Sequence, residues 1–165
     1  MIVYEEILRE FARRKVKYVL VGGMALNLHG SSRNTADLDL LVEMSDENLA
    51  KIVGILKKRG YRVRQPVDPM GIADAKTRKS WIHQKHMKAF NFYKDDEFKE
   101  VDLIIDSPVL YEQAIQKVER MVLGDLVLPV VSIDHLIKMK TKAGRDIDRM
   151  DLKQLRRIKR LRKEK

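Results

Sequence analysis

The hydrophobic positions of this chain follow two periods, one helical and one alternating. Near the start, apolar residues recur every three or four positions and predict an amphipathic helix over residues 3–15. Residues 17–21 form a short β-rich run that ends at Gly22 and Gly23. Residues 37–43 then alternate apolar and polar side chains, as a half-buried strand does. The chain therefore opens as helix, strand, glycine turn, short helix and strand.

The rest of the chain mixes the two periods in a similar way. Residues 88–93 and 98–105 flank a polar turn and predict a β-hairpin, and residues 121–131 predict a second one. Helical patterns follow Ser45 and Ser132, and a further helix is expected from Ser107-Pro108 to about Lys117. A last helix follows Gly144, whereas residues 66–80 predict a loop that can hold one short helix. These elements predict an α/β fold, a mixed sheet with helices packed on it.

Length and composition limit the classes of protein that this chain can represent. Its 165 residues predict one domain, with a core over about 1–131 and C-terminal helices over about 132–165. The absence of cysteine excludes disulfides, thiolate metal sites and cysteine nucleophiles. No secretory leader pattern opens the chain, and nowhere do about 18 apolar residues run together. We therefore expect a cytoplasmic protein with no membrane partner.

The formal net charge of +10 is concentrated at the end of the chain. From Lys153 onward, eight basic residues stand against the single acidic Glu164. Such a tail favours polyanions, so RNA or tRNA is a candidate partner. A solvated helix end has the same composition, and the sequence leaves both interpretations open.

Three aspartates carry the strongest indication of chemistry. Asp37 and Asp39 are two apart on a predicted strand, so both carboxylates point to the same face. Asp102 lies within the apolar run of a later strand, where a carboxylate needs a partner. Like charges side by side are costly unless a cation lies between them, and Mg²⁺ prefers such oxygen ligands. The three residues are therefore candidate ligands of a shared metal ion.

The pair Gly22-Gly23 follows one strand and precedes a helix, where backbone N–H groups can approach a phosphate. With these residues in view, the stretch VLVGGMALNLHGSSRNTADLDLLV, from Val19 to Val42, resembles the signature of DNA polymerase β-like nucleotidyltransferases. Asp102 matches the third carboxylate of that superfamily. The setting of His29-Gly30, Arg33 and Thr35 looks most like the AbiEii/AbiGii type of abortive-infection toxins, and LIKMKTKAGRDIDRMDL from Leu136 is similar to their helical tail.

This resemblance implies a role for each residue. Gly22 and Gly23 would bind the triphosphate of an NTP. Asp37 and Asp39 would hold two Mg²⁺ ions, and Asp102 would ligate one of them and help to deprotonate the attacking hydroxyl. Further candidate nucleotide-binding residues are Arg33, Thr35, Lys140 and Arg145. Arg33 can equally pair with a carboxylate, and Lys140 and Arg145 can equally be solvated cations.

The resulting prediction is a Mg²⁺-dependent enzyme that moves a nucleoside monophosphate (NMP) from an NTP to a hydroxyl of RNA, a protein or a small molecule. A role in a toxin–antitoxin system, with a protein partner, is open. The alternative is a non-catalytic module with the same fold, acting as an antitoxin or an RNA-binding partner through the basic tail.

Overall fold

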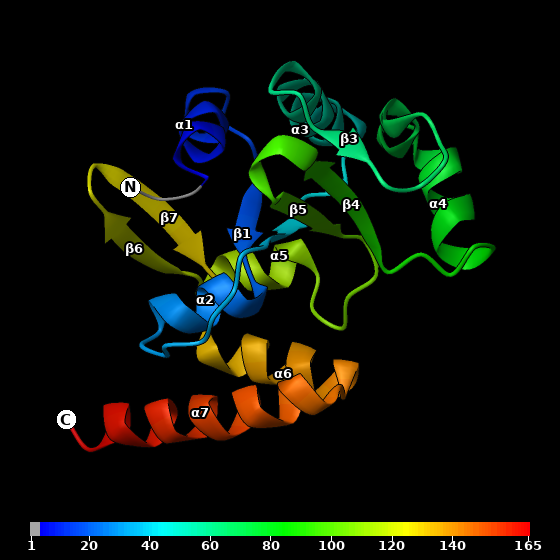
Figure 1. The fold of residues 1–165 in the computed structure, drawn as a ribbon. Helices are drawn as coiled ribbons and strands as arrows, with labels where there is room; N and C mark the ends of the chain where they lie inside the picture. The colour runs from blue at the N-terminus through cyan, green and yellow to red at the C-terminus, as the bar shows by residue number, and fades with distance from the viewer. Residues whose placement is uncertain (1–3) are drawn as a thin grey trace.

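The computed structural model describes residues 4–165 and contains a mixed seven-stranded sheet with helices on it (Figure 1). The strands are β1 (Tyr18–Leu20), β2 (Leu38–Val42), β3 (Arg62–Val63), β4 (Ala89–Lys94), β5 (Lys99–Ile104), β6 (Glu119–Leu123) and β7 (Leu126–Val130). The α-helices are α1 (Glu5–Arg13), α2 (Gly22–Leu28), α3 (Asp46–Lys58), α4 (Ala75–His83), α5 (Tyr111–Ala114), α6 (Ile133–Ala143) and α7 (Asp146–Lys163). The predicted fold class is confirmed.

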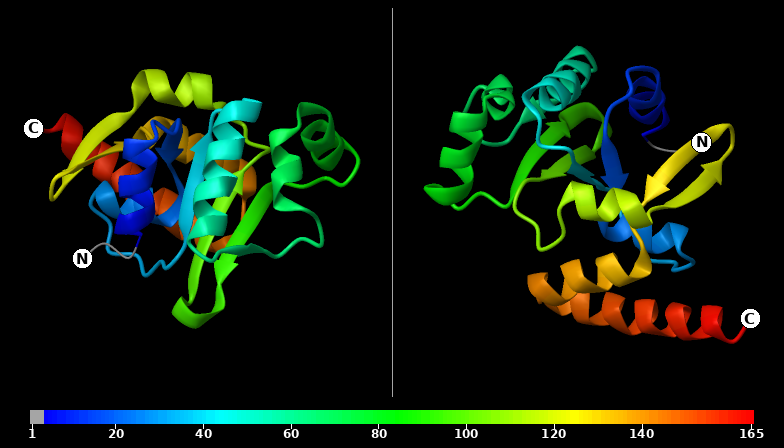
Figure 2. Two further views of the ribbon diagram at one scale, coloured as in Figure 1. Left: turned by 90° about the horizontal axis from the view of Figure 1, so that it is seen from above. Right: turned by 180° about the vertical axis from the view of Figure 1, so that it is seen from behind.

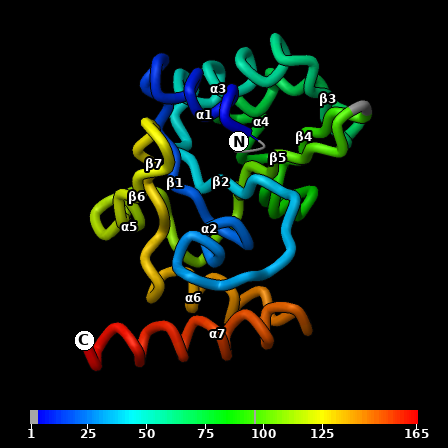
Figure 3. The backbone as a smooth tube through the Cα atoms, turned by 60° about the vertical axis from the view of Figure 1, so that its left-hand side comes forward, coloured from blue at the N-terminus to red at the C-terminus, as the bar shows by residue number. Residues whose placement is uncertain are grey.

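The strand order is β3-β4-β5-β2-β1-β7-β6, which places β2 and β5 side by side near the middle of the sheet. These two strands are parallel, as are β1 and β7, and the remaining pairs are antiparallel. Both predicted hairpins are present, as β4–β5 and β6–β7. The wide connection from α2 to β2 leads the chain back to the centre of the sheet (Figure 3).

Helices α1 and α3 lie next to one another over the sheet (Figure 2). The apolar stripe that predicted α1 is buried, with Leu8 and Phe11 fully enclosed. Ser45 caps α3 by accepting the Asn48 N–H, and Ser132 caps α6 by accepting the His135 N–H. Helix α6 ends at Gly144, whose φ of +64° suits glycine. Local capping signals thus placed both helices correctly.

One predicted helix start is wrong. The chain does not become helical at Ser107-Pro108, because the Ser107 hydroxyl accepts the Val109 N–H and holds a local turn. Leu110 is still extended, and α5 begins only at Tyr111 as a short helix continued by a 3-10 turn over Ile115–Lys117. The serine–proline pair therefore does not act as a helix N-terminus here, because the next residues form a turn and an extended segment.

The stretch predicted to be mainly loop is more ordered than the sequence indicated. It contains a 3-10 helix, Pro69–Ala73, and then α4, whose first turn is capped by Asp74. Trp81 on α4 is buried in the core and stacks on Phe90 with ring centroids 5.2 Å apart. Among the described helices, none is long and apolar enough to cross a membrane.

Candidate active site

Asp39 and Asp102 lie directly opposite one another on the central parallel strands β2 and β5. In-register partners of a parallel pair point to the same face of the sheet. The alternate residues, Leu38 and Leu40 on β2, are fully buried on the other face. Asp37 immediately precedes β2 and lies two residues before Asp39, so its side chain is expected on the same face of the sheet. The two aspartate-bearing strands are therefore neighbours, as candidate ligands of a shared metal ion have to be.

Burial and neighbouring negative charge raise the pKa of all three carboxylates. Burial raises the pKa of Asp39 to about 6, and the like charges of Asp102 and Asp37 add to the rise. Burial also raises the pKa of Asp102, against a hydrogen bond from Asn91, and the charge of Asp37 raises it further. The pKa of Asp37 is raised by burial and by Glu100. The site therefore holds more negative charge than its surroundings neutralise.

Glycine is required where the backbone passes the carboxylates. Gly22 has a φ of +66°, and a Cβ atom there would lie 1.9 Å from Oδ2 of Asp39. A Cβ atom on Gly23 would lie 2.7 Å from the Thr35 hydroxyl oxygen. The Gly23 N–H also hydrogen-bonds the Asp39 carboxylate and lowers its pKa. The glycine pair thus lets the backbone pass directly against the Asp39 carboxylate, and its predicted contact with a phosphate stays a prediction.

Asn91 on β4 is a site residue that the sequence did not reveal. It lies opposite Asp102 in the β4–β5 hairpin and donates to Oδ1 of that carboxylate at 2.7 Å. Gln65 in turn donates to the Asn91 side-chain oxygen at 2.7 Å. Only the hairpin register brings these groups together, and the positions of the residues in the chain give no sign of it.

The donor set fits a hard divalent cation, because it consists of carboxylate oxygens that repel one another. The side-chain positions are not yet those of a bound ion: within residues 4–165, no three acidic or histidine side chains already form a metal-binding group. The Asn91 amide holds one oxygen of Asp102, and Asp39 is turned toward Gly23. Side-chain rotation of Asp39 or Asp102 would therefore have to accompany binding of Mg²⁺.

A second set of charges lies between the antiparallel helices α6 and α7. Lys140 of α6 is buried and pairs with Asp151 at 2.7 Å and with Asp148 at 3.4 Å. Arg33 pairs with Asp151 at 2.5 Å, and Arg145 pairs with Asp148 at 2.8 Å. We call these five residues the helix ion network. Lys140 is thus no solvated cation, and Arg33 pairs with a carboxylate, one of the two roles that the sequence left open.

The helix ion network reaches the carboxylates of the sheet through its electrostatic field. Attraction by Lys140 lowers the pKa of Asp39, and Asp39 helps to raise the pKa of Arg145. The Arg145 side chain is 68% exposed, so it remains accessible from solvent while it pairs with Asp148. Asp148 also accepts the Arg145 N–H in the first turn of α7, where negative charge is favourable.

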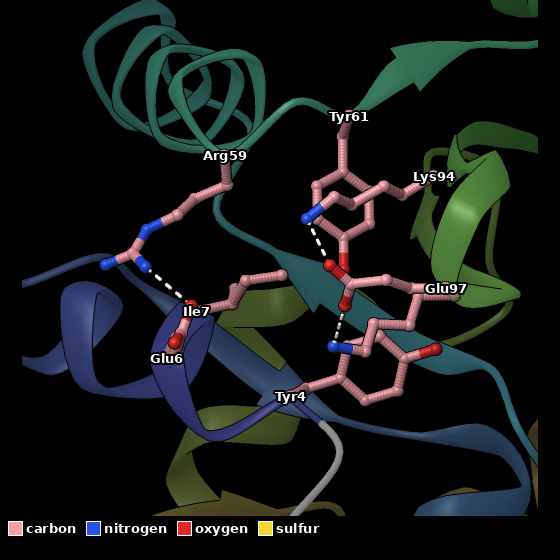
Figure 4. Close-up of a pocket in the computed structure, with 8 residues that line it drawn as sticks. Tyr4, Glu6, Ile7, Arg59, Tyr61, Lys94 and Glu97 are labelled. Atoms are coloured by element: carbon pink, nitrogen blue, oxygen red, sulfur yellow. Dashed lines mark hydrogen bonds and ion pairs between the residues drawn. The ribbon is translucent and has the colours of Figure 1, made fainter.

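A small cavity of about 40 Å³ lies away from this site, between the start of α1, the end of α3 and the β4–β5 turn (Figure 4). Ion pairs of Glu97 with Lys94 and Lys99, and of Arg59 with Glu6, cross its walls. A cavity of this size holds a water molecule or two and no nucleotide. The candidate site is therefore the sheet face that carries Asp39 and Asp102.

Comparison with known proteins decides the family. The model of the aminoglycoside-2''-adenylyltransferase family matches residues 3–155, which is most of the chain. The chain belongs to that family. It is accordingly a nucleotidyltransferase enzyme, of a family that transfers an NMP group to a hydroxyl. A comparison with curated protein sequences finds no match.

Solved structures show the fold of this aminoglycoside-2''-adenylyltransferase family member in distant relatives. The lincosamide antibiotic adenylyltransferase LnuA, with lincomycin bound, has a TM-score of 0.64 at 18% identity, covering 94% of this chain and 96% of that one. ANT(2'')-Ia in complex with adenylyl-2''-tobramycin has a TM-score of 0.60 at 15% identity, covering 98% and 94%. A solution structure of the antibiotic-resistance factor ANT(2'')-Ia also has a TM-score of 0.60 at 15% identity, covering 93% and 80%.

Proposed function

We propose that this enzyme transfers AMP from ATP to a hydroxyl group of a small cationic antibiotic of the aminoglycoside class, with Mg²⁺ bound at Asp37, Asp39 and Asp102. The observation that carries the proposal is the register of Asp39 opposite Asp102, with the glycine pair against the Asp39 carboxylate. Phosphoryl transfer requires charge neutralisation and alignment more than covalent help, and this arrangement provides groups for both.

Each residue has a definite task in this reaction. Backbone N–H groups at Gly22 and Gly23 would bind the triphosphate once Asp39 has turned away from Gly23. Asp37 and Asp39 would hold two Mg²⁺ ions, and Asp102 would be a further ligand of one of them. When bound, Mg²⁺ neutralises negative charge on the triphosphate and on the departing pyrophosphate. Asp102 accepts the proton of the acceptor hydroxyl, whose oxygen bonds to the α-phosphorus while the bond from that phosphorus to the pyrophosphate oxygen breaks.

The remaining candidates act on the nucleotide side. Lys140 supplies positive potential beside Asp39 from its fixed position in the helix ion network. Arg145 is accessible enough to turn from Asp148 toward the β- and γ-phosphates. Thr35 packs against Gly23 and supports the triphosphate turn. Arg33 holds its loop to α7 through Asp151, so its contribution to phosphate binding is indirect.

The charge of the sheet face favours a cationic acceptor. Glu100 lies two residues before Asp102 on β5 and therefore faces the same way, and its charge raises the pKa of Asp37 and of Asp102. One arginine, Arg64, pairs with Glu100. Four carboxylates against this one arginine leave the sheet face acidic, and an amino sugar brings the complementary charge.

A second candidate acceptor is RNA, as the resemblance to AbiEii/AbiGii toxins suggests. In that case the enzyme is a toxin-antitoxin component with a protein partner. The supporting observation is the exposed basic side of α7, with Lys153, Arg156, Arg157 and Arg160. Two other cations of this helix are engaged within the protein, Lys159 with Asp134 and Arg162 with Glu119. The tail is therefore less available to a polyanion than its composition implies.

A labelling experiment separates these acceptors. The purified protein is incubated with Mg²⁺ and each α-³²P-labelled NTP, together with an aminoglycoside panel, a lincosamide, total tRNA or a cell extract. We expect label from ATP on an aminoglycoside, with the mass of one added AMP group. Label on RNA or on a protein would replace the proposed acceptor, and no label from any NTP would overturn the proposal.

A further inference from the structure

We infer that Tyr4 is a positioning residue of the active site, whose hydroxyl fixes the segment before β2 against β5 and so sets the spacing of the carboxylates at Asp37 and Asp102. The inference rests on the proposed function, because it assumes that these carboxylates work together. It assigns a task to the first turn of the chain, far from the signature residues in sequence.

The Tyr4 hydroxyl makes three contacts with the backbone of two separate segments. It lies 2.5 Å from the carbonyl oxygen of Ala36 and 2.9 Å from that of Glu100, and its one proton can be donated to either. Its oxygen accepts the Glu100 N–H at 3.1 Å. Ala36 immediately precedes Asp37, and Glu100 stands two residues before Asp102.

The Tyr4 hydroxyl lies just before the point where β2 and β5 begin to pair. The first in-register pair of β2 and β5 is Leu38 opposite Val101, and the ladder continues from there past Asp39 and Asp102. Before that pair, Tyr4 joins Ala36 to Glu100 in place of a backbone-to-backbone bond. The phenol thus extends the β2–β5 connection to the residues that carry the outer carboxylates.

Burial makes this connection firm. Tyr4 is 1% exposed and belongs to the core together with Ile7 and Leu8 of α1. Its ring also forms one wall of the small cavity beside the β4–β5 turn (Figure 4). Burial raises the pKa of Tyr4 to about 12, so the hydroxyl keeps its proton at neutral pH. The start of α1 therefore holds the Tyr4 hydroxyl in a fixed place beside Ala36 and Glu100.

A small shift at this point has a large chemical consequence. Mg²⁺ accepts oxygen ligands only at about 2.0–2.1 Å, and a misplacement of about 1 Å can lower a catalysed rate about 100-fold. Without the hydroxyl, the segment that carries Asp37 is no longer tied to β5 beside Asp102. The ring, in contrast, would still fill its place in the core.

The test removes the hydroxyl alone, with Tyr4→Phe, and uses Tyr18→Phe as a matched control. Tyr18 is also buried, and among the described residues its hydroxyl has no hydrogen-bond partner in the structure. We expect Tyr4→Phe to lower kcat about 10- to 100-fold with the KM for ATP changed less than about two-fold. Amide hydrogen exchange at Glu100 should become about ten-fold faster, because this N–H loses its acceptor. Tyr18→Phe should change neither quantity.

A third measurement separates the inference from the proposed function. Titration with Mn²⁺ and a non-hydrolysable ATP analogue, followed by electron paramagnetic resonance, should show metal affinity reduced at least three-fold in Tyr4→Phe and unchanged in Tyr18→Phe. Unchanged metal affinity and kcat in Tyr4→Phe would overturn the inference, even if Glu100 exchanged faster. If the parent transfers nothing to any acceptor, the proposed function fails, and the Mn²⁺ titration alone decides the role of Tyr4.

Discussion

Two groups of aspartates in this enzyme, one half-buried on the sheet and one buried between helices, have opposite electrostatic surroundings. Asp37, Asp39 and Asp102 face one another on the sheet, and their pKa values are raised. Asp148 and Asp151 are more deeply enclosed in the helix ion network, yet each is paired with two cations. For Asp148, the hydrogen bonds and charges of Arg145 and Lys140 outweigh burial and lower the pKa.

The difference shows which carboxylates are structural and which are available for function. The helix ion network contains its own counter-ions, so it is complete without a ligand. Within the described part of the chain, no cation makes a hydrogen bond to the carboxylates of the sheet, and Lys140 acts on Asp39 only through its field. Because this repulsion persists in the native state, binding of a cation together with the substrate would relieve it and stabilise the folded protein.

The largest expected effect comes from neutralising one carboxylate of the sheet. Asp39→Asn should lower nucleotidyl transfer by at least about 1,000-fold, because a metal ligand worth several kcal/mol to the transition state is lost. The free energy of unfolding without metal should stay level or rise, since repulsion is relieved. Steady-state kinetics and urea denaturation measure the two quantities. Asp106→Asn, at an exposed position just after β5, is the control and should change neither.

Neutralising one carboxylate of the helix ion network should have the opposite outcome. Asp151→Asn leaves Lys140 buried without its closest partner and releases Arg33, so it should lower the free energy of unfolding by about 3 kcal/mol. The matched control, Asp146→Asn, removes a carboxylate that is 95% exposed in the same helix and should cost less than about 0.5 kcal/mol. Equal stability of the two variants in urea would contradict the distinction between the two groups.

A smaller effect is expected from pH. Because the folded-state pKa of Asp148 is lowered, the unfolded chain takes up this proton first as the pH falls below about 4. Asp148 therefore contributes stability above that pH, and the contribution is lost as the pH falls through its folded-state pKa. Urea denaturation of the parent and of Asp148→Asn should give stabilities that converge toward acid pH. If the difference in free energy of unfolding between the parent and Asp148→Asn stayed constant from neutral to acid pH, the ion pairs of Asp148 would not be the source of its stabilising effect.

The smallest effect concerns the exposed cations of α7. Arg157→Ala with Arg160→Ala should change stability by less than about 0.5 kcal/mol, because no ion pair joins either residue to another side chain in the described part of the chain. Transfer to a small cationic acceptor should be unaffected. If RNA binds here, the slope of log affinity against log salt should become shallower by about 1.5. Filter binding over a range of salt measures it, and an unchanged slope would exclude this surface as the RNA site.

The sequence predicts those parts of the site that rest on local patterns. The alternation around Asp39, the glycine turn and the apolar setting of Asp102 are each read within a few residues, and the structure brings them together. The supporting groups could not be predicted in this way. Asn91 reaches Asp102 through the hairpin register, and Lys140 meets Asp151 only when α6 packs on α7.

The structure departs from the sequence prediction at one helix start and in one predicted loop, and both departures have the same origin. The helix expected at Ser107-Pro108 was placed by a capping pattern, but the Ser107 hydroxyl serves a local turn. Residues 66–80 lack a strong hydrophobic period, yet α4 is held there by the contact of Trp81 with Phe90. In both places a tertiary or turn interaction decides the structure, and the helical pattern alone does not.

The strand order has a consequence for how the chain acquires its activity. The hairpins β4–β5 and β6–β7 join neighbouring segments, whereas the parallel pairs β2–β5 and β1–β7 join segments distant in sequence. Pairing of distant segments carries the greater loop-closure entropy and is the slower step of folding. Asp39 and Asp102 stand on one of these late-forming pairs. In a refolding experiment, secondary structure should therefore recover before the ability to bind a metal–nucleotide complex.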